Sequence, residues 1–280
     1  MKLTSITNTT CLLIASFLAI SALLIVNQRK FIYHPQRYAT PPYDTKSLQT
    51  ISYTLNNHQQ QAYFWCTTPK PKKVWVILSG NAALALQWLP FIKEIKATDT
   101  GFYLIDYPGY GVNGGTPTQK NNREGVLFAI EALTKQQPTV KHIFLLGQSL
   151  GAAVAIDVAN TIKPQAMILI SPFTSLADMS QVVFGQTWTW LLQSFLLDPY
   201  NSQDTLSELR HNHPHMHVTI IHGDRDQVVP VQMGRQLAQE NHSWINYEEI
   251  RNEGHDLGLQ SMRKVQSIIE KLSSESPQVQ

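Results

Sequence analysis

The chain has 280 residues, of which 22 are Lys or Arg and 20 are Asp or Glu, so its formal net charge is only +2. Hydrophobic cores usually split into separate domains only beyond about 250–300 residues, so this length suits one large domain with a tail. The near balance of charge, without any strongly basic stretch, argues against nucleic acid as a partner.

The N-terminal region is uncharged from residue 3 to residue 28, and its apolar core is CLLIASFLAISALLIV (11–26). A membrane helix needs about 20 mostly apolar residues. A cleaved signal peptide would need small residues where NQRK (27–30) stands, and a buried core helix would need a polar face. We therefore expect residues 1–30 to form an uncleaved membrane anchor, with its helix at about 9–27. The few flanking charges favour, by a small difference, a cytoplasmic location for the domain that follows.

Beyond this anchor, residues 31–47 are rich in Pro and Tyr and are expected to form an extended linker. Runs typical of strands and helices then alternate, and most of the strands are continuously apolar, as strands covered on both faces are. The predicted strands are 49–55, 61–67, 74–80, 102–107, 142–147, 166–171, 218–223 and 245–250, and the predicted helices lie around 86–97, 120–136, 149–162, 230–240 and 257–273.

The first two predicted strands flank NNHQQ and indicate an antiparallel hairpin at one edge of the sheet. The alternation that follows predicts an α/β fold with a mostly parallel eight-stranded sheet and helices on both faces. This domain is expected to span residues 48–274, followed by a polar tail at 275–280.

One connection, residues 174–217, is too long for an ordinary loop. Its middle, VVFGQTWTWLLQSFLLDPY (182–200), is rich in aromatic residues. Inserts of this kind are commonly lids or binding loops, and the alternative is an ordinary packed helix pair. We expect a helical cap here, and an apolar cap would accept acyl chains.

Ligands of open α/β sheets bind beyond the carboxyl ends of the strands, and Ser149 follows one such end. It lies in GQSLG, directly after the predicted strand 142–147 and at the start of a predicted helix. A tight turn between a strand and a helix projects a hydroxyl outward, as a nucleophile requires. The alternative, an incidental loop serine between two glycines, does not explain this position.

A carboxylate and an imidazole follow the last two predicted strands. Asp226, in HGDRDQVVP, could accept the imidazole N–H and so fix the tautomer of a general base. The alternative is Asp224, which we assign instead to shaping the turn. His255 follows the last strand in NEGHDLG, and the chain order Ser149, Asp226, His255 is the order expected when three such residues meet at one sheet edge.

The loop LSGNAAL (78–84) ends the first long parallel strand. An oxyanion hole needs two backbone N–H groups, and we expect them from Asn81 and from Leu150, the residue after the nucleophile. A plain turn is the alternative for the loop. Four histidines alternate in RHNHPHMH (210–217), but they lack the helical spacing and carboxylate support of a zinc site, so no metal is expected.

Together these blocks resemble the α/β-hydrolase superfamily over nearly all of 48–274, and within it the Bem46 / ABHD13-like membrane-anchored serine hydrolases. The blocks that carry the resemblance, in the family's order, are FIYHP, SGNA, DYPGYGVNGGTP, GQSLGAAVA, SPFTSL, HGDRDQVVP and GHD. The resemblance implies Ser149 as nucleophile, His255 as general base and then acid, and Asp226 as its orienting partner, without cofactor or metal. In one departure, Ser79 stands where the family usually has a histidine that braces the oxyanion loop.

We therefore expect a membrane-tethered serine hydrolase that cleaves carboxylic esters or thioesters, of acyl-lipids or acyl-proteins, through an acyl-enzyme. Its expected partners are a small or lipid-like acyl substrate and the membrane. An amide or peptide hydrolase would use the same three residues. A catalytically silent scaffold that binds a partner at the membrane is the alternative from a different class.

Overall fold

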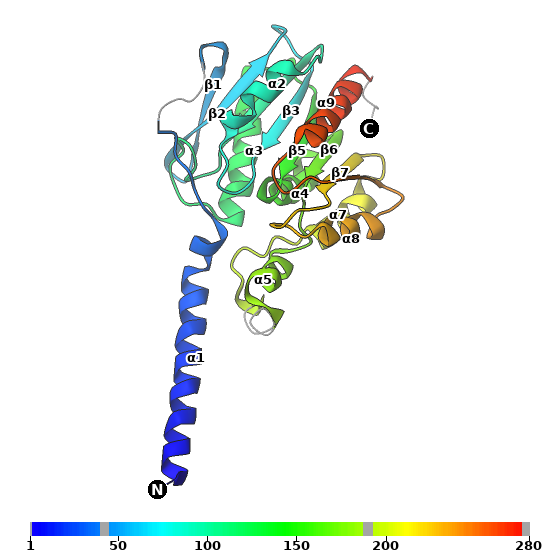
Figure 1. Ribbon diagram of the computed structural model, residues 1–280. Coiled ribbons are helices and arrows are strands. Elements are labelled where there is room, and N and C mark those ends of the chain that lie inside the picture. The colour runs from blue at the N-terminus through cyan, green and yellow to red at the C-terminus, as the bar shows by residue number, and fades with distance from the viewer. Residues whose placement is uncertain (1, 40–44, 187–192, 276–280) are drawn as a thin grey trace.

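The central sheet has eight strands in the order β1-β2-β4-β3-β5-β6-β7-β8 (Figure 1). The structure is a computed structural model that describes residues 2–39, 45–186 and 193–275. In this part of the chain the strands are β1 (Gln49–Leu55), β2 (His58–Cys66), β3 (Lys73–Leu78), β4 (Thr100–Ile105), β5 (His142–Gln148), β6 (Ala166–Ile170), β7 (His217–Gly223) and β8 (Ile245–Ile250).

Strands β4, β3, β5, β6, β7 and β8 are parallel to one another, whereas β1 and β2 pair antiparallel and join the sheet at β4. This confirms the mostly parallel eight-stranded sheet with an antiparallel hairpin at its edge. In the parallel register Leu78 is paired with Gly147, and Gln148 with Ile170. The carboxyl ends of β3, β5 and β6 therefore lie next to one another.

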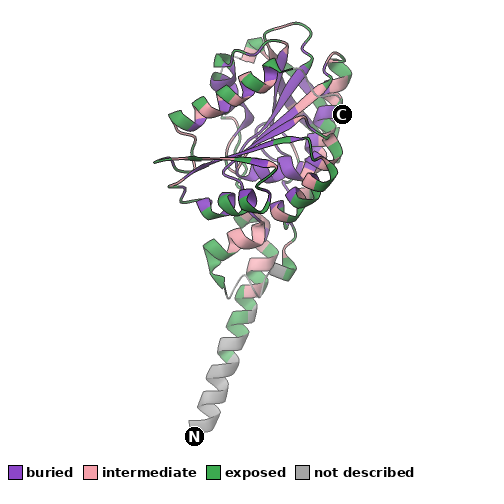
Figure 2. Cartoon of the chain, turned by 90° about the vertical axis from the view of Figure 1, so that its right-hand side faces the viewer, coloured by how far each residue is buried: buried purple, intermediate pink, exposed green. Residues whose placement is uncertain are grey.

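Helices cover both faces of this sheet, because alternate residues of each strand point to opposite faces. Val76 of β3 packs in one core with α3 (Gln119–Gln136), α4 (Leu150–Ile162), α7 (Ser202–Asn212) and α8 (Val231–Glu240). Trp75 and Ile77 pack in a second core with α2 (Leu89–Glu94) and α9 (Leu259–Ser274). Figure 2 shows the buried strands between these helical layers.

The expected linker is partly docked onto the domain. Tyr33 is buried and Arg37 forms an isolated bridge with Gly111. The turn η1 (Thr45–Ser47) leads into β1, and a second short 3-10 turn, η2 (Ala85–Trp88), precedes α2. Residues 40–44 of the linker and 276–280 of the tail lie outside the described residues.

The long insert divides into two parts of different character. Its first part holds α5 (Leu176–Phe184), in which no residue is buried, and the turn η3 (Gln193–Phe195). Its second part is α7, whose Leu206 and Leu209 are fully buried in the helical layer. The first part forms a cap at the end of the molecule from which the N-terminal helix emerges (Figure 1). Residues 187–192 of the insert lie outside the described residues.

The N-terminal helix, α1 (Lys2–Ile32), extends away from the body of the protein (Figure 1). Its segment Ala15–Ile32 is long and apolar enough to cross a membrane. From residue 15 to residue 27 every side chain whose burial is described is exposed or half-buried, which contradicts the core-helix alternative. The helix also continues past the expected end at residue 27, through Arg29 and Lys30, because cations are favourable in the last turn of a helix.

Two glycines allow β5 and α4 to approach their neighbours closely. A Cβ atom on Gly151 would lie 2.0 Å from the carbonyl oxygen of Leu78, and one on Gly147 would lie 2.2 Å from the carbonyl oxygen of Gly151. Both obstacles are backbone atoms, which cannot move aside as a flexible side chain can. Glycine is therefore required at both positions for the turn between β5 and α4 to form.

Asp106, just after β4, is a carboxylate buried inside the domain. Its two oxygens accept hydrogen bonds from the backbone N–H of Ala85, at 2.8 Å, and from the hydroxyl of Tyr38, at 2.7 Å. Burial raises the pKa of Asp106 to about 6, although the two hydrogen bonds oppose this shift. The carboxylate thus joins the segment after α1 to the turn before α2.

Replacing Gly151 by alanine is expected to lower the free energy of unfolding by at least about 2 kcal/mol, because the methyl group would have to displace backbone. The matched control is Gly125→Ala in α3, where the added Cβ would lie 3.5 Å or more from its neighbours. Alanine also favours the helix there, so the change should stay within about 1 kcal/mol and be stabilising. Chemical denaturation of the full chain in detergent measures both, and equal effects would contradict the close approach.

The pH dependence of stability should report the burial of Asp106. Its pKa is about 6 when folded and about 3.9 when unfolded, so its neutral form contributes stability that is complete below about pH 4. That stability is lost as the pH rises through about 6. We expect wild-type protein to lose about 3 kcal/mol more than Asp106→Asn between about pH 4 and pH 7. Parallel pH curves for the two proteins would show that the carboxyl group titrates normally.

Candidate active site

Ser149 occupies the sharp turn between β5 and α4. Its backbone angles are φ 53° and ψ −115°, in a region that non-glycine residues rarely adopt unless their surroundings enforce it. The backbone N–H of Ser149 donates a hydrogen bond of 2.8 Å to the carbonyl oxygen of Ile170 in β6. This is the backbone geometry by which a strand-to-helix turn exposes a nucleophile at the carboxyl edge of the sheet.

Asp226 and His255 form a hydrogen-bonded pair beyond the ends of β7 and β8. Nδ1 of His255 lies 2.8 Å from Oδ2 of Asp226. The other oxygen, Oδ1, accepts the backbone N–H groups of Val228 and Val229, both at 2.9 Å. Since Nδ1 of His255 is held by a carboxylate, its Nε2 is left as the atom that can take a proton.

Asp224, the alternative aspartate, has a different partner. Its Oδ1 accepts the backbone N–H of Asn252 at 2.7 Å, so it joins the turn after β7 to the turn after β8. Its carboxylate is therefore committed to holding the two loops together, whereas the imidazole of His255 is bonded to Asp226.

A second histidine, His222, also contacts the carboxylate of Asp226. Its side chain is fully buried, and its Nε2 lies 3.3 Å from Oδ2 of Asp226 and 3.0 Å from the carbonyl oxygen of Val229. Burial would raise the pKa of Asp226, but hydrogen bonds from His222, His255 and the N–H of Val229 hold that pKa well below its usual range. The carboxylate stays ionised and can stabilise an imidazolium at His255.

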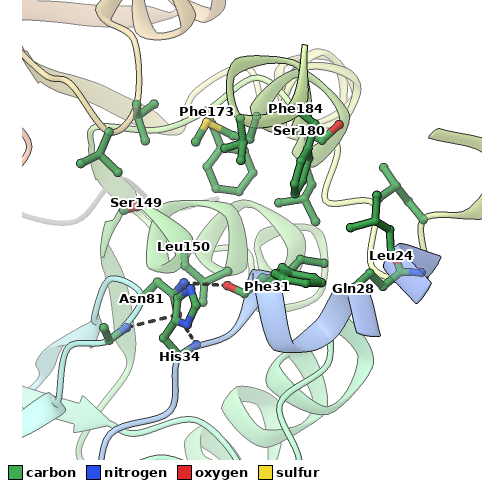
Figure 3. Close-up of a pocket in the computed structure, with 18 of the residues that line it drawn as sticks. Leu24, Gln28, Phe31, His34, Asn81, Ser149, Leu150, Phe173, Ser180 and Phe184 are labelled. Atoms are coloured by element: carbon green, nitrogen blue, oxygen red, sulfur yellow. Dashed lines mark hydrogen bonds between the residues drawn. The ribbon is translucent and has the colours of Figure 1, made fainter. Parts of the chain in front are cut away.

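Ser149 and His255 line the same pocket, which has a volume of about 660 Å³. Figure 3 shows Ser149 in the wall of this pocket. The side-chain amide of Gln148 also donates to the carbonyl oxygen of His255 at 3.4 Å, so the loop after β8 is bonded to the residue before Ser149. Within the described residues no hydrogen bond joins the Ser149 hydroxyl to the His255 ring. Such bonds often tighten only when substrate is bound.

Two unpaired backbone N–H groups lie beside Ser149. Neither the N–H of Asn81 nor that of Leu150 donates a hydrogen bond to a described residue. The loop with Asn81 lies against the turn, because a Cβ on Gly80 would be 3.6 Å from Cβ of Ser149. An oxyanion requires unpaired N–H groups near a nucleophile, so the assignment of these two groups to an oxyanion hole stays a prediction that this arrangement permits.

Sequence reasoning missed the side chains that brace this loop. The hydroxyl of Tyr107 donates to the carbonyl oxygen of Ser79 at 2.8 Å, and that of Tyr110 donates to Oδ1 of Asn81, also at 2.8 Å. Ser79 itself is buried, and its hydroxyl has no hydrogen-bond partner among the described residues. The available signal was the block DYPGYG, which follows β4 at the same edge of the sheet.

The alternating histidines of residues 210–217 lie at the end of α7 and the start of β7, and none of them lines the pocket. Across residues 2–39, 45–186 and 193–275, no three His, Cys, Asp or Glu side chains are grouped closely enough to hold a metal ion.

Several curated proteins are similar to the chain in sequence. It is 30% identical to an uncharacterized protein of Mycobacterium tuberculosis over 196 residues, which are 69% of this chain and 66% of that protein. It is 28% identical to protein bem46 of Schizosaccharomyces pombe over 58% of this chain and 54% of that protein. It is 30% identical to lysophosphatidylserine lipase ABHD12 of Danio rerio over 49% of this chain and 39% of that protein. The chain thus spans between 39% and 66% of the lengths of these relatives.

Solved structures with the same fold are more distant in sequence. The esterase Pf2001 of Pyrococcus furiosus superposes with a TM-score of 0.65 at 17% identity, over 85% of this chain and 97% of that one. Est1E of Butyrivibrio proteoclasticus gives a TM-score of 0.60 at 14% identity, over 81% of this chain and 97% of that one. These similarities confirm the α/β-hydrolase fold.

A family model described as "Serine aminopeptidase, S33" matches residues 69–215, which include β3, the loop with Asn81, and Ser149. The similarity to bem46 and to ABHD proteins confirms the resemblance seen in the sequence blocks. The chain therefore belongs to the serine aminopeptidase S33 family of the α/β-hydrolases.

Proposed function

We propose that this hydrolase cleaves carboxylic esters or thioesters through an acyl-enzyme on Ser149, while α1 tethers it to a membrane. The observation that carries the proposal is the pair formed by His255 and Asp226 at 2.8 Å, whose imidazole lines the same pocket as Ser149. Hydroxyl, imidazole and carboxylate are the three groups of a serine-hydrolase triad, which is recognised by geometry and roles rather than by sequence position.

The reaction begins when Oγ of Ser149 attacks the carbonyl carbon and Nε2 of His255 takes its proton. The negative charge of the tetrahedral intermediate is stabilised by the backbone N–H groups of Asn81 and Leu150. The carbon–oxygen or carbon–sulfur bond then breaks, and His255 protonates the leaving alcohol or thiol. Water repeats the sequence on the acyl-enzyme, which releases the acid and restores the Ser149 hydroxyl.

The lining of the pocket favours an uncharged acyl group. Among the described residues that line it, most are apolar, and none is Asp, Glu, Lys or Arg. An aminopeptidase would need an anionic group to hold the substrate's terminal ammonium, because a charge is costly to bury without a partner. The family's description names aminopeptidases, but the uncharged lining here supports an ester or thioester of an apolar acid. The names of the relatives, a lipase and an esterase, agree with this choice.

The end of the molecule that holds the pocket supports a location at a membrane. α1 emerges there beside the cap (Figure 1), and the cap exposes the large apolar side chains Val183, Phe184, Phe195 and Leu197. Exposed apolar patches of this kind commonly contact lipid or another protein. The substrates proposed here are therefore acyl-lipids or acylated proteins that are presented at the bilayer surface.

A fluorophosphonate probe tests the proposed nucleophile. The probe should label the full chain in detergent, and Ser149→Ala should abolish the labelling, because Ser149 is the proposed nucleophile and lines the same pocket as the imidazole of His255. Ser207→Ala is the matched control, since Ser207 is exposed on α7 and, among the described residues, its hydroxyl bonds only to the Gln203 carbonyl oxygen. Labelling that persists in Ser149→Ala would show that another side chain is the reactive nucleophile, and the absence of labelling in wild type would support the silent-scaffold alternative.

The two neighbouring aspartates should differ strongly in their effect on turnover. Asp226→Asn is expected to lower kcat for p-nitrophenyl acyl esters by about 1,000-fold or more, because the wrong tautomer of His255 is then favoured. Asp224→Asn should cost far less, since its amide oxygen can still accept the N–H of Asn252. Steady-state kinetics of both variants measure this difference in kcat. Similar losses of kcat in the two variants would contradict the role of Asp226 in orienting His255.

A further inference from the structure

The wall of the pocket includes the last turns of the N-terminal helix. Leu24, Ile25, Gln28, Phe31 and Ile32 all line it, together with Ser149 (Figure 3). The same five residues belong to the segment Ala15–Ile32 that is long and apolar enough to span a membrane. The candidate span and the catalytic pocket therefore share side chains.

The end of α1 makes specific side-chain bonds to the cap. Nε of Arg29 lies 2.8 Å from Oδ2 of Asp198, whose side chain is only 3% exposed. The side-chain amide of Gln28 donates to the carbonyl oxygen of Phe195 at 3.1 Å and accepts the N–H of Leu197 at 2.8 Å. A flexible tether would make none of these contacts, so the helix end has a defined position over the pocket.

On its other side, the end of α1 is bonded to Asn81. The side-chain amide of Asn81 donates to the carbonyl oxygen of Ile32 at 2.6 Å, and its Oδ1 accepts the N–H of His34 at 3.0 Å (Figure 3). The Ile32 carbonyl is in the last turn of the helix, where carbonyl oxygens lack an intrahelical partner. The same Oδ1 also accepts the hydroxyl of Tyr110 at 2.8 Å.

We infer that the end of α1 is a working part of the active site, and that the Asn81 side chain is the positioning residue that couples it to the oxyanion loop, residues 79–82. The inference rests on the proposed function, since it assigns the Asn81 N–H to the oxyanion. With its amide held by Ile32, His34 and Tyr110, the orientation of the Asn81 backbone is fixed. If the helix end leaves the pocket, Ile32 and His34 leave with it. The Asn81 backbone N–H is then no longer held in the orientation that an oxyanion requires.

Two features of the loop explain why it needs an external support. Ala82 has a φ of 59°, which costs free energy in a residue with a Cβ atom. The hydroxyl of Ser79 has no partner among the described residues, so this side chain does not brace the loop. The contacts of Asn81 with Ile32, at the end of α1, and with His34 add a restraint to those given by Tyr107 and Tyr110.

The helix end also contributes a wall that acts on the acyl chain. The ring of Phe31 packs edge-to-face against that of Phe184 in α5, with centroids 6.5 Å apart. Both rings line the pocket. This contact should matter for long chains that reach it and not for an acetyl group, whereas the oxyanion loop acts on every substrate. The two roles of α1 can therefore be separated by chain length.

Kinetics of the full chain in detergent, with acetyl and dodecanoyl p-nitrophenyl esters, test the inference. Asn81→Ala keeps the backbone N–H but should lower kcat about 10- to 100-fold for both esters, with KM nearly unchanged. Phe31→Ala should raise KM for the dodecanoyl ester alone. Asn27→Ala is the matched control, because within the described part of the chain the Asn27 amide bonds only to the Leu23 carbonyl oxygen on α1, and Asn27 is not among the residues that line the pocket. It should leave both reactions unchanged.

Amide hydrogen exchange gives a readout that does not depend on activity. In Asn81→Ala, peptides covering residues 30–38 and 79–84 should exchange faster than in wild type, while the strands of the sheet keep their protection. Unchanged kcat in Asn81→Ala, or a loss confined to the dodecanoyl ester, would overturn the positioning role. If wild-type protein hydrolyses neither ester, the proposed function fails, and unchanged exchange in the variant would then also overturn the docking of the helix by Asn81.

Discussion

The close approach of α4 to the end of β3 is the constraint on which the site depends. Gly151 brings the first turn of α4 against the carbonyl oxygen of Leu78, so Ser149 is forced into a strained turn at the edge of the sheet. The loop that follows β3 then begins beside the same turn, because Leu78 and Gly147 are paired across the two strands. Ser149 and the loop of residues 79–82, the proposed nucleophile and oxyanion loop, are thus placed by a single packing contact between backbones.

The other half of the site is organised electrostatically around Asp226. This carboxylate receives hydrogen bonds from two imidazoles and two backbone N–H groups, and so it remains ionised although it is buried. An ionised carboxylate beside His255 fixes the ring and favours its protonated form during reaction. The turn after β7 therefore holds His255, the proposed base, while the turn after β5 holds Ser149, the proposed nucleophile, and the parallel strands bring both to one edge of the sheet.

Much of this arrangement was predictable because it follows from local patterns. Continuous apolar runs predicted the strands, and glycines around Ser149 at a strand end predicted the turn. The sequence could not settle the choice between Asp224 and Asp226, because both lie in one turn. Their hydrogen bonds distinguish them: Asp224 accepts the N–H of Asn252, whereas Asp226 is bonded to the ring of His255. His222 was missed because it lies within an apolar strand, where one polar residue carries no periodic signal.

The contribution of the N-terminal helix could not be predicted for a different reason. Asn81 contacts Ile32 and His34, which precede it by almost fifty residues and belong to residues 31–47, the segment that the sequence predicted to be an extended linker. Nothing in the spacing of these residues indicates that they meet. Arg29 and Lys30 follow the apolar run in the sequence and lie in the last turn of α1. Their charge gave no indication that Arg29 pairs with the buried Asp198.

The central claim is that Ser149 carries the acyl group between two half-reactions. Rapid-quench mass spectrometry of the full chain with a p-nitrophenyl acyl ester tests it most directly, since a burst of nitrophenol with an accumulating acyl-enzyme is the expected kinetic signature. The account predicts an acyl adduct on the peptide of residues 142–163, at Ser149. Turnover without any adduct, or an adduct on a different side chain, would contradict it.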